Sequence, residues 1–293
     1  MAIIGLILLE KNMIYADIIL MYNKPVLSSK DLQFFKKIIF EAGQKASVTQ
    51  RSGFQSARKD DTTIVTEADK STQDYLVKKI SNRFKEMNFV YEENFDRNIM
   101  NMDDDKLTAI IDPIDGTAMF SMNLPFWCVS VGIFSGFEPA YGFIYSPGCN
   151  MFFYNDDENA FCNEKIITAD KSLIPESETN IFFASELIKT YNLTTVGKIR
   201  NLGSTALHAV LIANNLASRG LAFIGSGNLW DWAGAIPILA KANCSIKYLS
   251  ERDVDFKEVA ENRYEFPETL LAYSSDDFNL VKQMFELRNT SAL

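Results

Sequence analysis

Residues 110–117 read Ile-Ile-Asp-Pro-Ile-Asp-Gly-Thr and place two carboxylates at the end of an apolar run. The β-branched residues predict a buried strand, and Pro113 lacks an N–H, so we expect the strand to stop there and turn. Asp112 and Asp115 flank this turn and can converge on one point. Gly116 allows close backbone approach, and the amides after it suit an anion. The stretch therefore predicts either a cation site beside a phosphate site, or a simple Asp-Pro turn with Asp115 as a helix cap.

The length and charge of the chain limit what it can do. At 293 residues it can form one large α/β domain or two smaller ones, and 47% hydrophobic residues indicate a globular protein. A formal net charge of −9 and the lack of a Lys/Arg run argue against a nucleic-acid groove. An acidic enzyme that binds phosphate needs positive charge from elsewhere, and metal ions would supply it.

Cysteine and histidine do not form a metal-binding pattern. Cys128, Cys149, Cys162 and Cys244 lack C-x-x-C spacing, which favours buried free thiols over disulfides or a zinc site. The single histidine, His208, lies among apolar residues and is expected to be buried in the core or at its rim. Any metal site should therefore use oxygen donors.

The N-terminus is apolar over residues 1–9, but no basic residue precedes this run, and Glu10 and Lys11 end it. The run is too short to span a bilayer and lacks a following cleavage site. It is interpreted as a packed terminal segment or a misassigned start codon, and the protein as cytoplasmic without membrane attachment.

Hydrophobic periodicity predicts two helices followed by many strands in the first half of the chain. The helices cover residues 27–46 and 66–87, with a polar loop or hairpin at 47–61 between them. Short strands are predicted at 62–65 and 89–91, and an antiparallel meander at 128–134, 140–145, 151–154 and 159–162.

A polar stretch at 168–180 divides the chain into predicted halves, 1–170 and 171–293, within a single compact unit. In the second half, strands alternate with helices, which indicates α+β or α/β layering. The strands are expected at 181–184, 221–224, 245–249 and 270–273, and the helices at 205–217, 230–242 and 276–288, the last capped by Ser274 or Ser275.

Five motifs in order resemble the inositol monophosphatase superfamily. Asp112–Thr117 is similar to its central signature, and the other four are Thr66–Asp69 (T-E-A-D), Tyr91–Glu93, Asn159–Ile166 and Leu229–Ala235. Tyr91 stands where the family has Gly. The resemblance implies the inositol monophosphatase–fructose bisphosphatase sandwich of alternating helix and sheet layers. It also implies a magnesium-dependent, lithium-sensitive phosphatase that forms a homodimer.

The resemblance implies two Mg²⁺ ions, possibly three, which suits hard oxygen ligands and phosphate ester hydrolysis by a metal-activated water. The implied metal ligands are Glu92, Asp112, the Ile114 carbonyl, Asp115 and Asp231. Asp112 would bridge the two ions. Glu92 and Thr117 would orient and deprotonate the attacking water, and Asp69 would lie near a third, weaker metal position.

Substrate contacts follow from the same resemblance. The implied contacts are Asp115, Gly116, Thr117, Gly203, Ser204, Thr205 and Asp231. Arg58 or Lys59 is a candidate for touching phosphate or a third metal, and a solvated charge is the alternative. Where inositol-type members place a Glu that contacts ring hydroxyls, this chain has Ile224. The sequence therefore predicts a less polar alcohol pocket.

The leading hypothesis is hydrolysis of a small phosphorylated alcohol or sugar, as in inositol monophosphatase. Fructose-1,6-bisphosphatase, 3′(2′),5′-bisphosphate nucleotidase and histidinol-phosphatase activities are alternatives, because these branches share the motifs. A regulatory binding protein of the same fold is the alternative that is not an enzyme. A P-loop phosphotransferase is excluded because no G-x-x-x-x-G-K-[ST] occurs.

Overall fold

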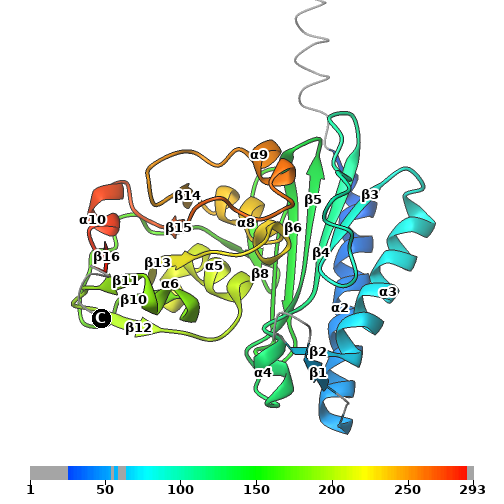
Figure 1. The fold of residues 1–293 in the computed structure, drawn as a ribbon, viewed down its shortest axis with the longest axis horizontal. Helices are drawn as coiled ribbons and strands as arrows, with labels where there is room; N and C mark the ends of the chain where they lie inside the picture. The colour runs from blue at the N-terminus through cyan, green and yellow to red at the C-terminus, as the bar shows by residue number, and fades with distance from the viewer. Residues whose placement is uncertain (1–25, 54–55, 59–63, 289–293) are drawn as a thin grey trace, which may run out of the picture.

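A seven-stranded sheet and a five-stranded sheet organise the fold in the computed structural model, which describes residues 26–53, 56–58 and 64–288 (Figure 1). Helices α2 and α3 lie against the outer face of the larger sheet, and shorter helices lie between the two sheets. The apolar N-terminal run and Lys59 lie outside the described residues, as does the side chain of Arg58. No helix in the described ranges is long and apolar enough to cross a membrane.

The larger sheet contains the predicted meander. Its strands, in order across the sheet, are β3 (Asn88–Tyr91), β4 (Leu107–Asp115), β5 (Cys128–Ser135), β6 (Glu138–Ser146), β7 (Met151–Asn155), β8 (Ala160–Cys162) and β9 (Lys165–Ile167). β3 runs parallel to β4, and every later pair is antiparallel. Neighbouring residues of β4 point to opposite faces, so Ile111 packs toward the outer helices and Ile110 toward the second half.

The two outer helices are α2 (Ser29–Ser52) and α3 (Glu67–Arg83). The predicted first helix is confirmed, but α2 continues through residues 47–52, where a loop or hairpin was expected. Gln50 explains the difference, because its amide donates to Phe120 O (3.0 Å) and accepts from Trp127 Nε1 (3.1 Å), anchoring the last turn. The expected hairpin follows as β1 (Ser56–Arg58) paired antiparallel with β2 (Ile64–Thr66).

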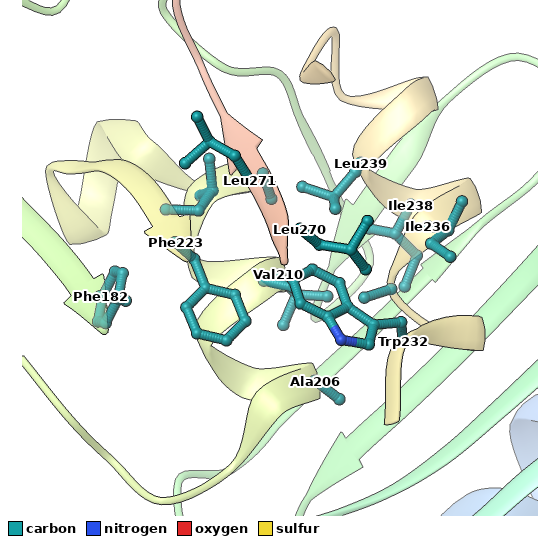
Figure 2. Close-up of a cluster of buried hydrophobic side chains, with 14 of the residues drawn as sticks. Phe182, Ala206, Val210, Phe223, Trp232, Ile236, Ile238, Leu239, Leu270 and Leu271 are labelled. Atoms are coloured by element: carbon teal, nitrogen blue, oxygen red, sulfur yellow. The ribbon is translucent and has the colours of Figure 1, made fainter. Parts of the chain in front are cut away.

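The second half forms a mixed sheet in the order β12-β10-β13-β15-β14. Its strands are β10 (Asn180–Phe183), β12 (Lys198–Arg200), β13 (Gly220–Gly225), β14 (Ser245–Tyr248) and β15 (Leu270–Tyr273). Figure 2 shows its core, where the indole of Trp232 lies beside Val210 and Leu270. This cluster joins the two sheets, because it also includes Ile110 and Phe134 of the larger sheet.

Several predicted helices in the second half are shorter than expected. The predicted helix 205–217 is two helices, α5 (Thr205–Ala213) and α6 (Asn215–Ser218), and 230–242 is α7 (Leu229–Ala233) and α8 (Ile236–Lys241). Two further helical elements, η1 (Ser185–Lys189) and α9 (Phe256–Glu261), were not predicted, nor were the strands β11 (Tyr191–Leu193) and β12.

The last predicted helix, 276–288, is wrong in its second half. Only α10 (Phe278–Lys282) is helical, and Asp277 rather than Ser274 or Ser275 caps it. Residues 285–287 form β16, which pairs antiparallel with β11. The pairing partner lies far away in the sequence, so local periodicity could not indicate it. The division of the chain near residue 170 stays a prediction.

Candidate functional site

The central motif forms a bulge at the end of β4. Asp112 pairs with Ser130 and Asp115 with Cys128, so the two intervening residues of β4 oppose a single residue of β5. The expectation that the strand stops at Pro113 is therefore wrong, because pairing resumes at Asp115. Both carboxylates are buried, and Asp112 Oδ1 accepts a hydrogen bond from Ile114 N (3.1 Å).

Two more predicted residues lie beside this motif. Tyr91 pairs with Ile111, and Glu92 N donates to Ile111 O (3.3 Å), so Glu92 follows β3 next to Asp112. The hydroxyl of Thr117 lies within hydrogen-bond distance of Asp69 Oδ1 (3.2 Å) and Ile114 O (3.0 Å). Asp69 is fully buried in the first turn of α3. The helix α3 thus contributes a carboxylate to the same place.

The loop before α5 touches the central motif through two glycines. Gly116 has φ 93°, and a Cβ there would lie 2.9 Å from Phe126 O and 3.1 Å from Gly203 O. Gly203 has φ 80°, and a Cβ there would lie 2.6 Å from Cγ of the Met119 side chain. Only glycine allows this approach without strain. The structure therefore brings Gly116 together with the predicted substrate loop Gly203–Thr205.

Asp115 lies against the N-terminus of α5. Its Oδ2 accepts from Ser204 Oγ (2.5 Å) and Ala206 N (2.6 Å), and its Oδ1 from Thr205 N (3.1 Å). Helix N-terminal amides stabilise a negative charge in this position. Burial raises the pKa of Asp115 to about 6 against the lowering effect of these hydrogen bonds. Both oxygens of Asp115 face α5 in this conformation.

Asp231 belongs to the first turn of α7, where part of the residue is exposed to solvent while its carboxylate is enclosed by protein. Its Oδ2 accepts from Asn228 N (2.6 Å), the residue before the helix. Burial raises its pKa well above the usual range, and the charges of Asp115 and Glu92 add to that shift. This carboxylate from the second half therefore lies close to those of the first half.

Asp112 lies at the centre of this electrostatic cluster. Its burial raises its pKa well above the usual range, and the charges of Glu92, Asp115, Asp231 and Asp69 all add to the rise. Within the described residues, Asp112, Asp115 and Asp231 form no ion pair. Carboxylates arranged this way favour a bound cation.

The donors fit a hard divalent cation, because they are carboxylate and carbonyl oxygens. In the part of the chain that the structure describes, no three His, Cys, Asp or Glu side chains are arranged to hold a metal ion as they stand. The hydrogen bonds on Asp115 and Asp231 direct oxygens of both carboxylates toward helix amides. The metal-ligand set stays a prediction, and ion binding would require these side chains to turn.

Cys128 and His208 are close to the site but are not catalytic candidates. Burial, then the charge of Asp115, raises the pKa of the Cys128 thiol well above its usual range, so the thiolate nucleophile is disfavoured. Burial lowers the pKa of His208 to about 3. Its Nε2 accepts from Leu202 N (2.7 Å), so it supports the loop before Gly203. The prediction of a buried histidine is confirmed, and all four cysteines are free. The prediction that the thiols are buried holds for Cys128 and Cys162 but is wrong for Cys149 and Cys244, which are partly exposed.

Ile224 does not line the site. Its side chain is fully buried in the core cluster on β13, so the prediction that it faces the alcohol pocket is wrong. Counting along the chain located the position but could not tell which face of the strand it occupies. Two residues near the site were not predicted from the sequence. The carboxylate of Glu186 accepts from Ser226 Oγ (3.4 Å), and Nη1 of Arg97 donates to Asn228 Oδ1 (3.0 Å). Neither residue belongs to a recognisable motif.

Comparisons with known proteins agree with the motifs. The family model "Inositol monophosphatase family" matches residues 28–276. Inositol monophosphatase 3 of Solanum lycopersicum is 31% identical over 178 residues, which cover 57% of this chain and 60% of that protein. Inositol monophosphatase 1 of the same plant is 28% identical over 233 residues, covering 72% and 83%.

A solved structure shows the same fold. The IMPase/NADP phosphatase complexed with NADP and Ca²⁺ aligns with a TM-score of 0.72 and 20% identity, covering 90% of this chain and 98% of that one. The predicted layered sandwich of helices and sheets is therefore confirmed.

Proposed function

Because this chain belongs to the inositol monophosphatase family and is therefore a phosphatase, we propose that it hydrolyses a small phosphate monoester with the help of divalent metal ions. The observation that supports the proposal is the cluster of carboxylates around Asp112, where burial and the charges of the neighbouring carboxylates together raise the pKa of Asp112. A protein that only binds a partner gains nothing from gathering these acids. Mg²⁺ is the ion that the oxygen donors suit best.

Glu92, Asp112, Ile114 O, Asp115 and Asp231 would hold two ions, and Asp69 lies where a third could be bound. Ions held there would supply the positive charge that the acidic site lacks and would activate a water molecule for attack.

The residues of the chain itself would bind and orient the reactants. The hydroxyl of Thr117, held between Asp69 and Ile114 O, would orient the attacking water together with Glu92. The amides of Gly116 and Thr117 would bind the phosphate, and Gly203–Thr205 would support the alcohol.

Inositol monophosphate is the leading substrate class, which agrees with the names of the curated relatives. A nucleotide-type ester is the second candidate, because a pocket of about 720 Å³ adjoins the loop that leads to Asp231. We also propose a homodimer, a cytoplasmic location and a chain of two halves divided near residue 170.

The test is a turnover screen over phosphate monoesters with Mg²⁺ and with EDTA. We expect phosphate release only with Mg²⁺, and inhibition by Li⁺ at millimolar order and by Ca²⁺. Asp112→Asn should lower kcat/KM about a thousandfold or more, since several kcal/mol of charge stabilisation depend on the ion. The asparagine oxygen can still accept the hydrogen bond from Ile114 N, so the fold should persist. Full activity in this variant, or in EDTA, would refute the metal assignment.

A further inference from the structure

The segment that follows β3 is held from two sides. On the side of β4, Glu92 N donates to Ile111 O (3.3 Å), which continues the parallel pairing of Tyr91 with Ile111. On the other side, the carboxamide of Gln73 in α3 binds the backbone of Glu93. Its Oε1 accepts from Glu93 N (3.0 Å), and its Nε2 donates to Glu93 O (3.0 Å). Both residues are buried, so the backbone around Glu92 is fixed between β4 and α3.

The carboxamide of Gln73 takes the place of a neighbouring strand. β3 is the outermost strand of the seven-stranded sheet, and among the described residues no further strand pairs with its outer side. The backbone groups of Glu92 point to β4, so those of the next residue, Glu93, point to the open edge. A strand at that edge would offer one donor and one acceptor. Gln73 offers the same two groups and extends the ladder past the end of β3.

This extended backbone determines where Glu92 lies. Val90 of β3 pairs with Ile110 of β4, and both pack toward the second half of the chain. Side chains two residues further along each strand return to the same face, which places Glu92 beside Asp112 on that face. A change of register by one residue would direct Glu92 to the opposite face. The hydrogen bonds to Glu93 oppose such a change.

The same face of α3 also contacts Thr117. Asp69 lies four residues before Gln73, so the two side chains are neighbours on one face of the helix. Oδ1 of Asp69 lies 3.2 Å from the hydroxyl of Thr117. The helix thus contacts both groups that are proposed to orient the attacking water. It reaches Thr117 through Asp69, and it reaches Glu92 through Gln73 and the backbone of Glu93.

We propose that Gln73 is a positioning residue, which keeps Glu92 in register with Asp112 and at a fixed separation from Thr117, and thereby strengthens the binding of Mg²⁺. The inference rests on the proposed function, in which Glu92 is a metal ligand and orients the water. Gln73 acts through the backbone of Glu93 and not by contact with the ion. Because its side chain is uncharged, its effect on the ion comes from geometry and not from charge.

Asn215 offers a matched control, because its carboxamide makes the same pair of hydrogen bonds elsewhere. Its Oδ1 accepts from Asp170 N (2.8 Å), and its Nδ2 donates to Asp170 O (2.9 Å) and to Ser274 Oγ (3.0 Å). Asn215 is buried, and neither it nor Asp170 belongs to the predicted site. Loss of either carboxamide removes buried hydrogen bonds and should destabilise the fold. Only the loss of Gln73 should also weaken ion binding.

The experiment measures two quantities in each protein, the Tm in EDTA and the calorimetric Kd for Mg²⁺. Gln73→Met and Asn215→Leu remove the hydrogen bonds at nearly constant side-chain volume. Gln73→Ala and Asn215→Ala form a second pair. They leave space in which a water molecule can bind the freed backbone groups, so they should disturb the fold less. This second pair provides the comparison if an apolar variant does not melt cooperatively.

We expect all four variants to melt below wild type in EDTA. The Kd for Mg²⁺ should rise about tenfold or more in the Gln73 variants, which is the usual effect of removing a group that orients a metal ligand, and change less than about twofold in the Asn215 variants. An unchanged Kd in the Gln73 variants, or equal rises in both sets, overturns the inference and leaves the proposed function standing. If wild type binds no Mg²⁺ and hydrolyses no monoester, the proposed function fails and the inference fails with it.

Discussion

Asp115 illustrates how one residue can serve the fold and the site together. Three donors around the N-terminus of α5 bind its carboxylate, and this explains why its pKa rises only to about 6 although it is buried. A cation would compete with these donors for the same oxygens. Among the described residues, the carboxylate of Asp112 accepts one hydrogen bond, from Ile114 N, and it is the better-placed carboxylate for the proposed bridging role.

The backbone of Gly116 is left-handed and closely surrounded, so a side chain at this position should destabilise the fold. Gly116→Ala should destabilise the protein by about 2–3 kcal/mol, from a left-handed backbone and from crowding against Phe126 O and Gly203 O. Gly53→Ala is the control, since Gly53 has φ 84° but a Cβ added to it would meet none of the described residues within 4 Å. It should cost about 1 kcal/mol from the backbone alone. Urea denaturation of both variants measures the difference, and equal losses would show that crowding at Gly116 has no effect.

His208 accepts a hydrogen bond from Leu202 N, just before the predicted substrate loop, and its burial predicts a pH dependence of the protein's stability. Its pKa is about 3 in the fold because it is buried, against about 6.5 when unfolded. Between these values the unfolded chain binds a proton that the native state does not. Stability should therefore fall as pH falls from 6.5 toward 3, by up to ~1.4 kcal/mol per pH unit, and be unaffected above 6.5.

This effect can be isolated because His208 is the single histidine of the chain. Denaturation of wild type and His208→Gln is measured at pH 7, 6 and 5. The free energy of unfolding should fall more steeply with falling pH in wild type, since the carboxylates contribute equally to both proteins. Parallel pH curves would contradict the prediction.

Arg97 links two elements that carry predicted ligands. It lies on the loop after Glu92, donates to Asn228 at the start of α7, and its guanidinium lies 4.6 Å from the ring centre of Trp230. Asn228 N in turn holds Asp231. Arg97→Ala should therefore raise the Mg²⁺ concentration for half-maximal activity, and the calorimetric Kd, about tenfold, because Asp231 loses its fixed relation to Glu92.

The control for this variant is Arg252→Ala. Arg252 also lies 4.6 Å from a ring centre, that of Tyr248, but it pairs with Glu258 and Glu268 away from the cluster. Arg252→Ala should leave the affinity for Mg²⁺ unchanged. Arg97→Lys should lower this affinity less than Arg97→Ala does, because lysine retains the positive charge. A similar loss in both alanine variants would show a general effect on the fold.

The features of the fold that the sequence predicted depend on residues that are neighbours in the chain. The Asp112–Thr117 motif, the meander and the position of Asp231 at a helix start all follow from local patterns. Features set by contacts between distant segments could not be predicted. The pairing of β11 with β16, the buried orientation of Ile224 and the approach of Glu186 to Ser226 each depend on partners far away in the chain.

The carboxylate cluster joins both halves of the chain, so a metal ion should stabilise the whole fold. An ion that binds only the native state raises the unfolding free energy by about 2.7 kcal/mol at a hundredfold excess over Kd. Calorimetry at fixed ionic strength should therefore give a higher Tm in MgCl₂ than in EDTA with NaCl.

Asp112→Asn should separate two effects on the stability of the fold: the destabilisation by a buried carboxylate and the stabilisation by a bound ion. Burial and neighbouring charges raise the pKa of Asp112 above its unfolded value, so its contribution to stability is present at low pH and is lost as pH rises toward the folded pKa. Metal-free wild type at pH 7 therefore holds a carboxylate that opposes folding, and asparagine removes that opposition. The variant should melt higher than wild type in EDTA and gain little from Mg²⁺. A lower Tm of the variant in EDTA would show that the Asp112 carboxylate does not destabilise the metal-free protein. An Mg²⁺-induced rise in Tm equal to that of wild type would show that Asp112 does not bind the ion.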